Sequence, residues 1–151
     1  MPQLSARQQA IQAAAVLGLE GKLGASTAPN YCLQFARLVI ERALKLKPRG
    51  FYTMVEDVDA DPCAAEVEDL IRVRHRDWVV KEPQVGDLVF WHDSPKGWGH
   101  VGVVVDLNGN GVLEVAQNTT RTTKVIKQYK GALRVIALQD HPRPTTVVRL
   151  P

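Results

Sequence analysis

Two apolar runs joined by a tight turn constrain the fold more than any other feature of this sequence. Residues 101–107 and 112–116 are strongly apolar, and Asn108-Gly109-Asn110-Gly111 lies between them. Asn-Gly between two apolar runs is one of the strongest short-range signals of a β-hairpin. Both sets of alternating positions in 101–105 are valine or glycine, so we expect both faces of this strand to be covered. The sequence therefore predicts a buried hairpin inside a larger sheet.

Helical patterns precede the strands. Residues 5–17, or on to Leu19, and about 31–45 carry apolar residues at helical spacing, and residues 64–73 form a shorter candidate. Further strands are predicted at 78–80, 88–91, 125–126 and 133–138. The Pro-rich residues 141–151 contain a Thr-Thr-Val-Val run and are expected to form an edge strand or an extended arm. Helices followed by an antiparallel meander indicate the α+β class.

Length and composition fit one domain of 151 residues, with a helical part at about 5–73, a sheet part at about 78–140 and an extended tail at 141–151. The net charge is +3 and the pI is near 9.0, but lysine and arginine are dispersed, so no nucleic-acid partner is expected. No apolar stretch approaches the roughly 20 residues of a membrane span. We expect a monomer that contacts no membrane.

A cysteine and a histidine occupy contexts that suit nucleophilic chemistry. Cys32 begins the second predicted helix, where the helix dipole favours a thiolate. His100 begins the central strand, from which an imidazole could take the thiol proton. The pair indicates a hydrolase or an acyl-transfer enzyme. The second cysteine, Cys63, is expected to be a buried free thiol.

A third polar group is expected at the far imidazole nitrogen, where it would fix the tautomer. The returning strand offers Glu114, Gln117 and Asn118. Hairpin pairing places Gln117 and Asn118 nearer to His100 than Glu114, which lies closer to the turn. The choice among the three stays open at this point.

Three sequence blocks resemble those of the NlpC-type and CHAP (cysteine, histidine-dependent amidohydrolase/peptidase) cell-wall hydrolases. They are Asn30-Tyr31-Cys32-Leu33-Gln34-Phe35-Ala36-Arg37, Pro83-Gln84-Val85-Gly86-Asp87-Leu88-Val89-Phe90-Trp91 and Gly99-His100-Val101-Gly102-Val103-Val104-Val105. The resemblance covers about residues 30–120. It implies a papain-like fold and cleavage of amide bonds in bacterial peptidoglycan, with the stem peptide as the partner and with both an endopeptidase and a sugar–peptide amidase left open. No cofactor is expected.

The resemblance also implies roles for individual residues. Cys32 matches the nucleophile and His100 the base, and Gln117, with Asn118 next, matches the third position. The backbone N–H of Cys32 would stabilise the oxyanion with one nearby donor, for which Tyr31 is a candidate. Trp91 and Trp98 could line the cleft and contact substrate, although core packing is favoured for Trp91.

An acidic segment raises the question of a metal site. Asp57, Asp59, Asp61 and Glu68 follow the ligand spacing of a calcium-binding loop. Pro62 stands where that loop requires glycine. We therefore predict no metal and interpret the segment as a solvated acidic loop.

Other functions remain open from the sequence. The same fold could serve an acyltransferase, or a non-enzymatic virion or assembly protein. The chain order of cysteine before histidine and the presence of both favour a hydrolase. The first residues show no secretory signal, so the protein is expected to be cytoplasmic until released, virion-associated or exported by a specialised route.

Overall fold

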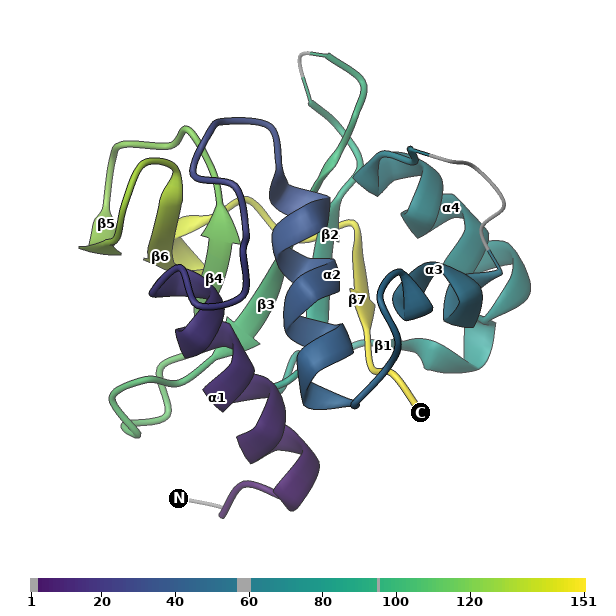
Figure 1. Ribbon diagram of the computed structural model, residues 1–151, viewed down its shortest axis with the longest axis horizontal. Coiled ribbons are helices and arrows are strands. Elements are labelled where there is room, and N and C mark those ends of the chain that lie inside the picture. The colour runs from purple at the N-terminus through teal and green to yellow at the C-terminus, as the bar shows by residue number, and fades with distance from the viewer. Residues whose placement is uncertain (1–2, 57–60, 95) are drawn as a thin grey trace.

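The computed structural model describes residues 3–56, 61–94 and 96–151. Its helices are α1 (Ala6–Leu19), α2 (Cys32–Ala43), α3 (Gly50–Val55) and α4 (Ala64–Arg74), with the short 3-10 helices η1 (Arg76–Trp78) and η2 (Leu138–Asp140). Its strands are β1 (Val79–Val80), β2 (Leu88–Trp91), β3 (His100–Val105), β4 (Glu114–Asn118), β5 (Val125–Gln128), β6 (Leu133–Ala137) and β7 (Thr146–Val148). The predicted α+β class is confirmed, and the arrangement is consistent with a papain-like fold (Figure 1).

The strands form one antiparallel sheet in the order β1-β7-β2-β3-β4-β6-β5. Strands β2, β3 and β4 are neighbours in sequence, as a meander requires, but β7 lies between β1 and β2 and β6 lies between β4 and β5. The expectation that residues 141–151 form an edge strand or an extended arm is therefore wrong for β7, which pairs on both sides. The physical reason is that pairing with β2 buries the apolar side chains of Val147 and Val148.

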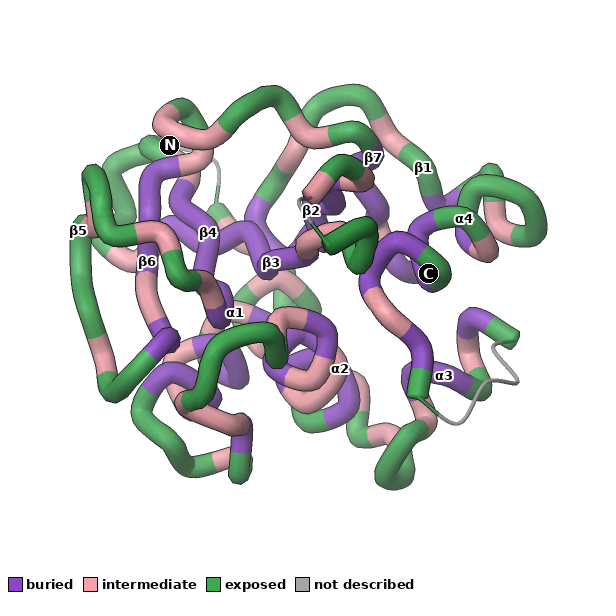
Figure 2. Tube along the Cα trace, turned by 90° about the horizontal axis from the view of Figure 1, so that it is seen from above, coloured by how far each residue is buried: buried purple, intermediate pink, exposed green. Residues whose placement is uncertain are grey.

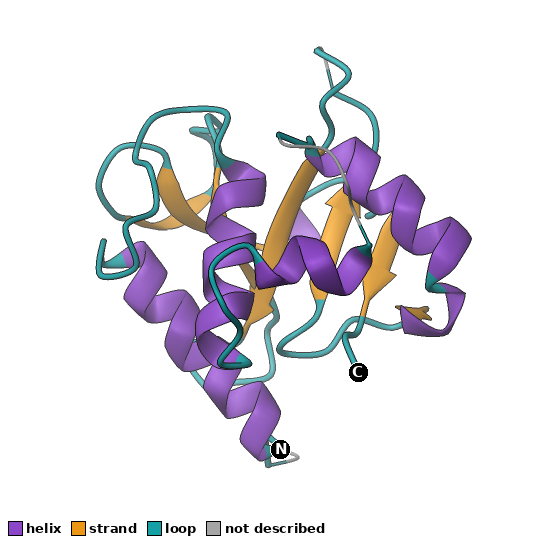
Figure 3. Ribbon diagram, turned by 45° about the vertical axis from the view of Figure 1, so that its right-hand side comes forward, coloured by secondary structure: helices purple, strands orange, loops and turns teal. Residues whose placement is uncertain are grey.

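The helices gather on one face of the sheet (Figure 3). Val101, Val103 and Val105 of β3 point into the main core between the helices and the sheet. Val104 points the other way, into a smaller cluster with Trp91. The connection from β6 to β7 passes across that second face (Figure 1). The central strands are accordingly buried on both faces, as predicted, while the surrounding loops are exposed (Figure 2).

Sequence patterns predict three of the helices to within one or two residues at most ends. The start of α1 has a capping box, in which Ser5 Oγ accepts from the Gln8 backbone at 3.1 Å and Gln8 Oε1 accepts from the Ser5 backbone at 2.8 Å. Helix α3 was not predicted, because it has only six residues and begins after Arg49 in a left-handed conformation, with φ of 64°. None of the helices in the described ranges is long and apolar enough to cross a membrane.

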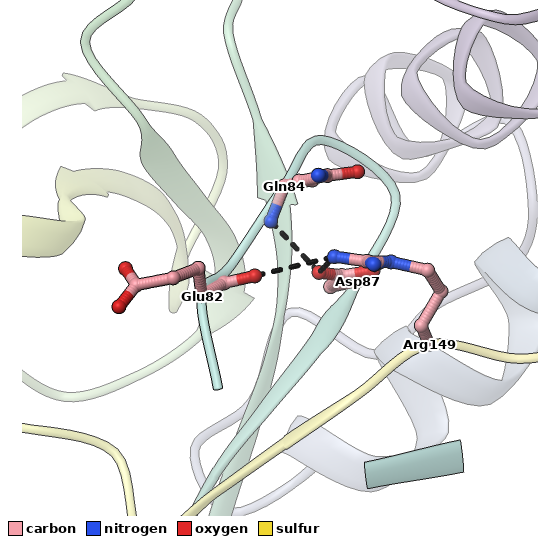
Figure 4. A network of polar contacts seen from close by, with 4 residues as sticks. All are labelled: Glu82, Gln84, Asp87 and Arg149. Atoms are coloured by element: carbon pink, nitrogen blue, oxygen red, sulfur yellow. Dashed lines mark hydrogen bonds and ion pairs between the residues drawn. The ribbon is translucent and has the colours of Figure 1, made fainter. Parts of the chain in front are cut away.

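The Gly-Asp motif before β2 ties the sheet to the last residues of the chain (Figure 4). Asp87 is 1% exposed and accepts two hydrogen bonds from Arg149, at 3.0 Å from Nε and 2.9 Å from Nη2. The backbone N–H of Gln84 donates to the same carboxylate at 2.7 Å, and Arg149 Nη2 also donates to the carbonyl of Glu82. This motif therefore anchors a turn and the tail.

Candidate functional site

A cleft of about 1000 Å³ brings together most of the predicted site residues. Cys32 comes from the first turn of α2 and His100 from the first position of β3. The residues from the prediction that line this cleft are Tyr31, Cys32, Trp98, His100 and Asn118, and Cys63 lies there as well. Gln117 and Trp91 contact the His100 ring but are not among the residues that line this cleft.

The chain turns sharply into α2 to present Cys32. Asn30 adopts a left-handed conformation with φ of 73°, which asparagine tolerates better than most residues. Tyr31, the N-cap residue, makes no side-chain hydrogen bond to the helix. The first backbone N–H groups of α2 are therefore not occupied by a cap.

Burial governs the ionisation of Cys32. It raises the pKa of the thiol, and backbone N–H groups of Val101, Leu33 and Cys32 itself offset that effect only in part. This direction is opposite to the one expected from the helix terminus alone, since desolvation disfavours the thiolate. Among the described residues no hydrogen bond joins the sulfur to the imidazole, and burial, the largest influence on the pKa of Cys32, favours the neutral thiol.

Two glycines position His100. A Cβ on Gly99, whose φ is 71°, would lie 2.8 Å from the backbone nitrogen of Ala65, and that nitrogen donates to the carbonyl of Trp98 at 2.8 Å. Gly99 thus lets the loop before His100 pack directly on the start of α4. Gly102 shares the sheet face of His100, and a Cβ there would lie 2.3 Å from Val115 Cγ1. The missing side chain leaves room for β4 residues to reach His100.

Gln117 contacts the imidazole. Its Oε1 lies 2.6 Å from His100 Nε2, and its Nε2 lies 3.4 Å from the carbonyl oxygen of Val115. A carbonyl can only accept, so the amide nitrogen faces Val115 and the amide oxygen faces His100. His100 must then donate from Nε2, which leaves Nδ1 without a proton when the ring is neutral. Burial lowers the pKa of His100, and the bond with Gln117 raises it by less.

Asn118 has a different set of partners, although it is adjacent in sequence. Its Nδ2 donates to the carbonyls of Ser26 and Ala28 at 3.1 and 2.8 Å, and its Oδ1 accepts from the backbone of Tyr31 at 3.3 Å. Asn118 therefore holds the loop that leads into Cys32. Glu114 lies at the opposite end of β4, where its carboxylate accepts from the Leu107 backbone at 3.0 Å.

The three aromatic residues predicted to contact substrate differ in solvent exposure: Tyr31 and Trp98 are exposed, and Trp91 is buried. Tyr31 is 45% exposed and Trp98 is 49% exposed, and both line the Cys32 cleft. Lys96 Nζ lies 4.8 Å from the centre of the Trp98 ring. Trp91 is buried in the sheet, its indole N–H donates to the carbonyl of Pro142 at 2.8 Å, and its ring lies 5.5 Å from that of His100.

Sequence reasoning missed His141. Its Nε2 lies 2.8 Å from Gln117 Nε2, and its ring centre lies 4.7 Å from that of Trp91. It follows η2, in a second hollow of about 570 Å³ that His100 also lines. The available signal was weak, because His141 stands before a proline in an irregular connection after η2, and only the sheet topology brings it to Gln117.

Within the described part of the chain, Cys63 and the acidic segment supply no further group in contact with His100, although Cys63 and Asp61 line the Cys32 cleft. Cys63 is a free, half-buried thiol at the N-cap of α4. Glu68 is buried and accepts from Thr146 Oγ1 at 2.6 Å, so its carboxylate joins α4 to β7. Asp57 and Asp59 lie outside the described residues. Within the described ranges, no three His, Cys, Asp or Glu side chains are grouped to hold a metal ion.

The arrangement brings a thiol, an imidazole that donates from Nε2 and the start of helix α2 to one cleft. A comparison with protein families matches residues 24–118, more than half of the chain, to the family described as CHAP domain. This range includes Cys32, His100 and Gln117 and ends before His141. No match was found among curated proteins or among solved structures.

Proposed function

Since the chain belongs to the CHAP domain family, whose members are generally hydrolases acting on peptidoglycan, we propose that it cleaves an amide bond of peptidoglycan with Cys32 as the nucleophile. The observation that supports this proposal is the shared cleft, onto which Cys32 and His100 both open. The bond between His100 Nε2 and Gln117 supports the role of base, because it leaves Nδ1 as the nitrogen able to accept a proton.

The proposed reaction begins from neutral partners. As the sulfur of Cys32 attacks the amide carbon, the thiol proton passes to His100 Nδ1. Backbone N–H groups at the start of α2 stabilise the oxyanion. Tyr31, which directly precedes Cys32 and lines the cleft, is the candidate for the second donor. The C–N bond breaks as Nδ1 returns the proton to the amine nitrogen, which leaves a thioester on Cys32.

Water completes the cycle. It attacks the thioester carbon while His100 Nδ1 takes its proton, and the C–S bond then breaks to release the carboxylic acid and restore the thiol. Gln117 keeps the imidazole in one tautomer through both halves of the reaction. Asn118 takes no part in these steps; it holds the loop before Cys32 in place.

The cleft suits an extended peptide with sugar attached. Tyr31 and Trp98 present exposed aromatic rings beside Cys32, and such rings stack on sugar and on peptide planes. We propose that they bind the stem peptide and its neighbouring sugar. Trp91 supports His100 from the sheet instead. We further propose that the protein acts as a monomer and reaches the wall after lysis, on a phage particle or through a specialised exporter.

The test compares two cysteine variants of equal size. Purified cell walls are incubated with wild type, Cys32→Ser or Cys63→Ser, while turbidity is followed and released fragments are identified by mass spectrometry. Cys63 lines the same cleft and caps α4, and serine is a good N-cap residue, so Cys63→Ser is a matched control. We expect fragments from wild type and from Cys63→Ser and none from Cys32→Ser.

The fragment masses identify the bond. A free lactyl group on the sugar indicates cleavage of the sugar–peptide amide, and shortened stem peptides indicate an endopeptidase. Equal release by Cys32→Ser would contradict the assigned nucleophile. No release by folded wild type, together with slow alkylation of Cys32 at neutral pH, would favour the non-enzymatic alternative.

A further inference from the structure

A second histidine lies behind the base. His141 Nε2 is 2.8 Å from Gln117 Nε2, and Gln117 Oε1 is 2.6 Å from His100 Nε2. The ring of His141 is held by Trp91, 4.7 Å away, and by the bond from the Trp91 indole to the carbonyl of Pro142. His141 belongs to the connection between η2 and β7, outside the range that matches the family.

The Gln117 amide is fully buried between the two imidazoles, so its orientation decides which nitrogens can carry protons. With its NH₂ group toward His141, the amide donates to an unprotonated Nε2 of that ring and presents its oxygen to His100. The reversed amide would present NH₂ to His100 Nε2 and force the His100 proton onto Nδ1. That tautomer cannot accept a proton from the Cys32 thiol.

We propose that His141 is a positioning residue, which holds the Gln117 amide so that His100 keeps its proton on Nε2 and its Nδ1 free to act as the base. This inference rests on the proposed function for its catalytic consequence. The carbonyl of Val115 also favours this orientation, but its distance of 3.4 Å makes it the weaker of the two acceptors.

The surroundings of His141 keep it a neutral acceptor. Burial, followed by the charges of His100 and Arg121, lowers its pKa to about 4, and Asp140 opposes this shift. Asp93 and Arg143 line the same hollow. At neutral pH the ring therefore accepts through Nε2. A protonated ring would set an N–H against the amide NH₂ group, which favours the reversed amide.

The test replaces His141 by Phe, which can stack on Trp91 but accepts no hydrogen bond, and by Gln, whose side-chain oxygen can accept. The His100 tautomer is read from ¹⁵N chemical shifts of the imidazole at pH 7. We expect wild type and His141→Gln to show the proton on Nε2, and His141→Phe to show a larger share on Nδ1. His141→Leu serves as a second apolar variant if the phenylalanine protein does not fold.

Wall hydrolysis gives the second readout. For His141→Phe we expect kcat to fall roughly 10- to 100-fold, as part of the general-base contribution of roughly 10²–10⁴, with KM nearly unchanged because His141 does not line the Cys32 cleft. His141→Gln should recover most of the loss. An unchanged tautomer with unchanged kcat in folded His141→Phe would overturn the proposal, and so would a loss of kcat that His141→Gln does not rescue.

The two proposals fail in different ways. If wild type hydrolyses no wall, the proposed function fails, whatever the tautomer shows. If wild type is active and the His100 tautomer does not respond to His141→Phe, only the inference about His141 fails. The tautomer measurement needs no substrate, so it can be repeated in Cys32→Ser.

Discussion

Two neutral histidines share one buried glutamine, and this has a consequence for stability as well as for chemistry. Protonation of His141 would turn its accepting Nε2 into a donor that faces the Gln117 NH₂ group, whereas a doubly protonated His100 would keep its hydrogen bond to Gln117 Oε1. Burial lowers the pKa of both His100 and His141. The folded protein therefore binds these protons less readily than the unfolded chain, in which histidine titrates near an ordinary pKa of about 6.5.

We expect the free energy of unfolding to fall as the pH falls from about 6.5 to 4. In this window the unfolded chain takes up a proton that folded His141 does not, so the native state is penalised. Because His141 is only half-buried and solvent screens it, its share should be about 1–2 kcal/mol. Urea unfolding of wild type and His141→Phe between pH 4 and 8 measures it.

The difference between the two proteins reports on His141 together with any change that its loss causes at His100. Glu68 acts in the opposite direction, since burial raises the pKa of its carboxyl group, but its contribution is common to both proteins. A parallel pH dependence in wild type and variant would contradict the assignment of this slope to His141.

At the residue scale, the sequence predicts which side chains meet but not which way each one points. Counting from the Asn-Gly turn predicts that Gln117 and Asn118 lie near His100; Gln117 contacts the ring, and Asn118 lines the same cleft as His100. Alternation along β4 sends them to opposite faces, so Gln117 reaches the imidazole and Asn118 reaches the loop before Cys32. His141 has no local pattern, because its contact depends on a strand order that no short motif specifies.

At the scale of elements, the hairpin of β3 and β4 is built around a missing side chain. Gly102 leaves the space into which Val115 packs, and Val115 is fully buried. Gln117 Cβ lies 3.4 Å from the place where a Cβ on Gly102 would stand. The spacing of the two strands and the reach of Gln117 therefore depend on the same glycine.

We expect Gly102→Ala to lower the free energy of unfolding by about 1–3 kcal/mol, because the added methyl group overpacks a filled site. Combining it with Val115→Ala should recover part of the loss, since the second change opens the space that the first one fills. Urea denaturation of the two single variants and the double variant measures the coupling. Strictly additive losses would show that Gly102 and Val115 do not compete for this space.

Secondary structure follows from the sequence where a local pattern is strong. The capping box of α1 and the Asn-Gly turn are local signals that predict their elements, although the connection between β3 and β4 spans residues 106–113 and is also held by Gln12 of α1. Helix α3 and strand β7 are short, and their positions are set by what they pack against. The apolar Val147-Val148 pair was visible, but its insertion between β1 and β2 depends on long-range pairing.

At the scale of the whole molecule, one ion pair joins the tail to the sheet. Asp87 is almost fully buried, whereas the side chain of Arg149 is 40% exposed. Removing the arginine leaves the carboxylate with the Gln84 backbone N–H as its remaining partner among the described contacts. The cost should therefore come mainly from an unpaired buried charge.

We expect Arg149→Ala to destabilise the protein by about 2–3 kcal/mol, since breaking a buried pair from one side costs about 3–5 kcal/mol and the partial exposure of Arg149 reduces this. The comparison is Lys22→Ala, which removes an exposed pair with Glu20 at 3.5 Å and should cost below about 0.5 kcal/mol. Thermal and urea unfolding provide both values. Equal effects of the two substitutions would contradict an anchoring role for Arg149.

The position of β7 also sets an order of events during synthesis. Strands β1 and β2 are made early, yet the strand that joins them in the sheet comes after every other strand in the chain. On the ribosome, a growing chain can close the β2–β3–β4 hairpins long before this gap is filled. The segment that contains β7 also carries His141 and Arg149. The sheet and the surroundings of His100 are therefore completed together. Cys32 has left the exit tunnel well before that point.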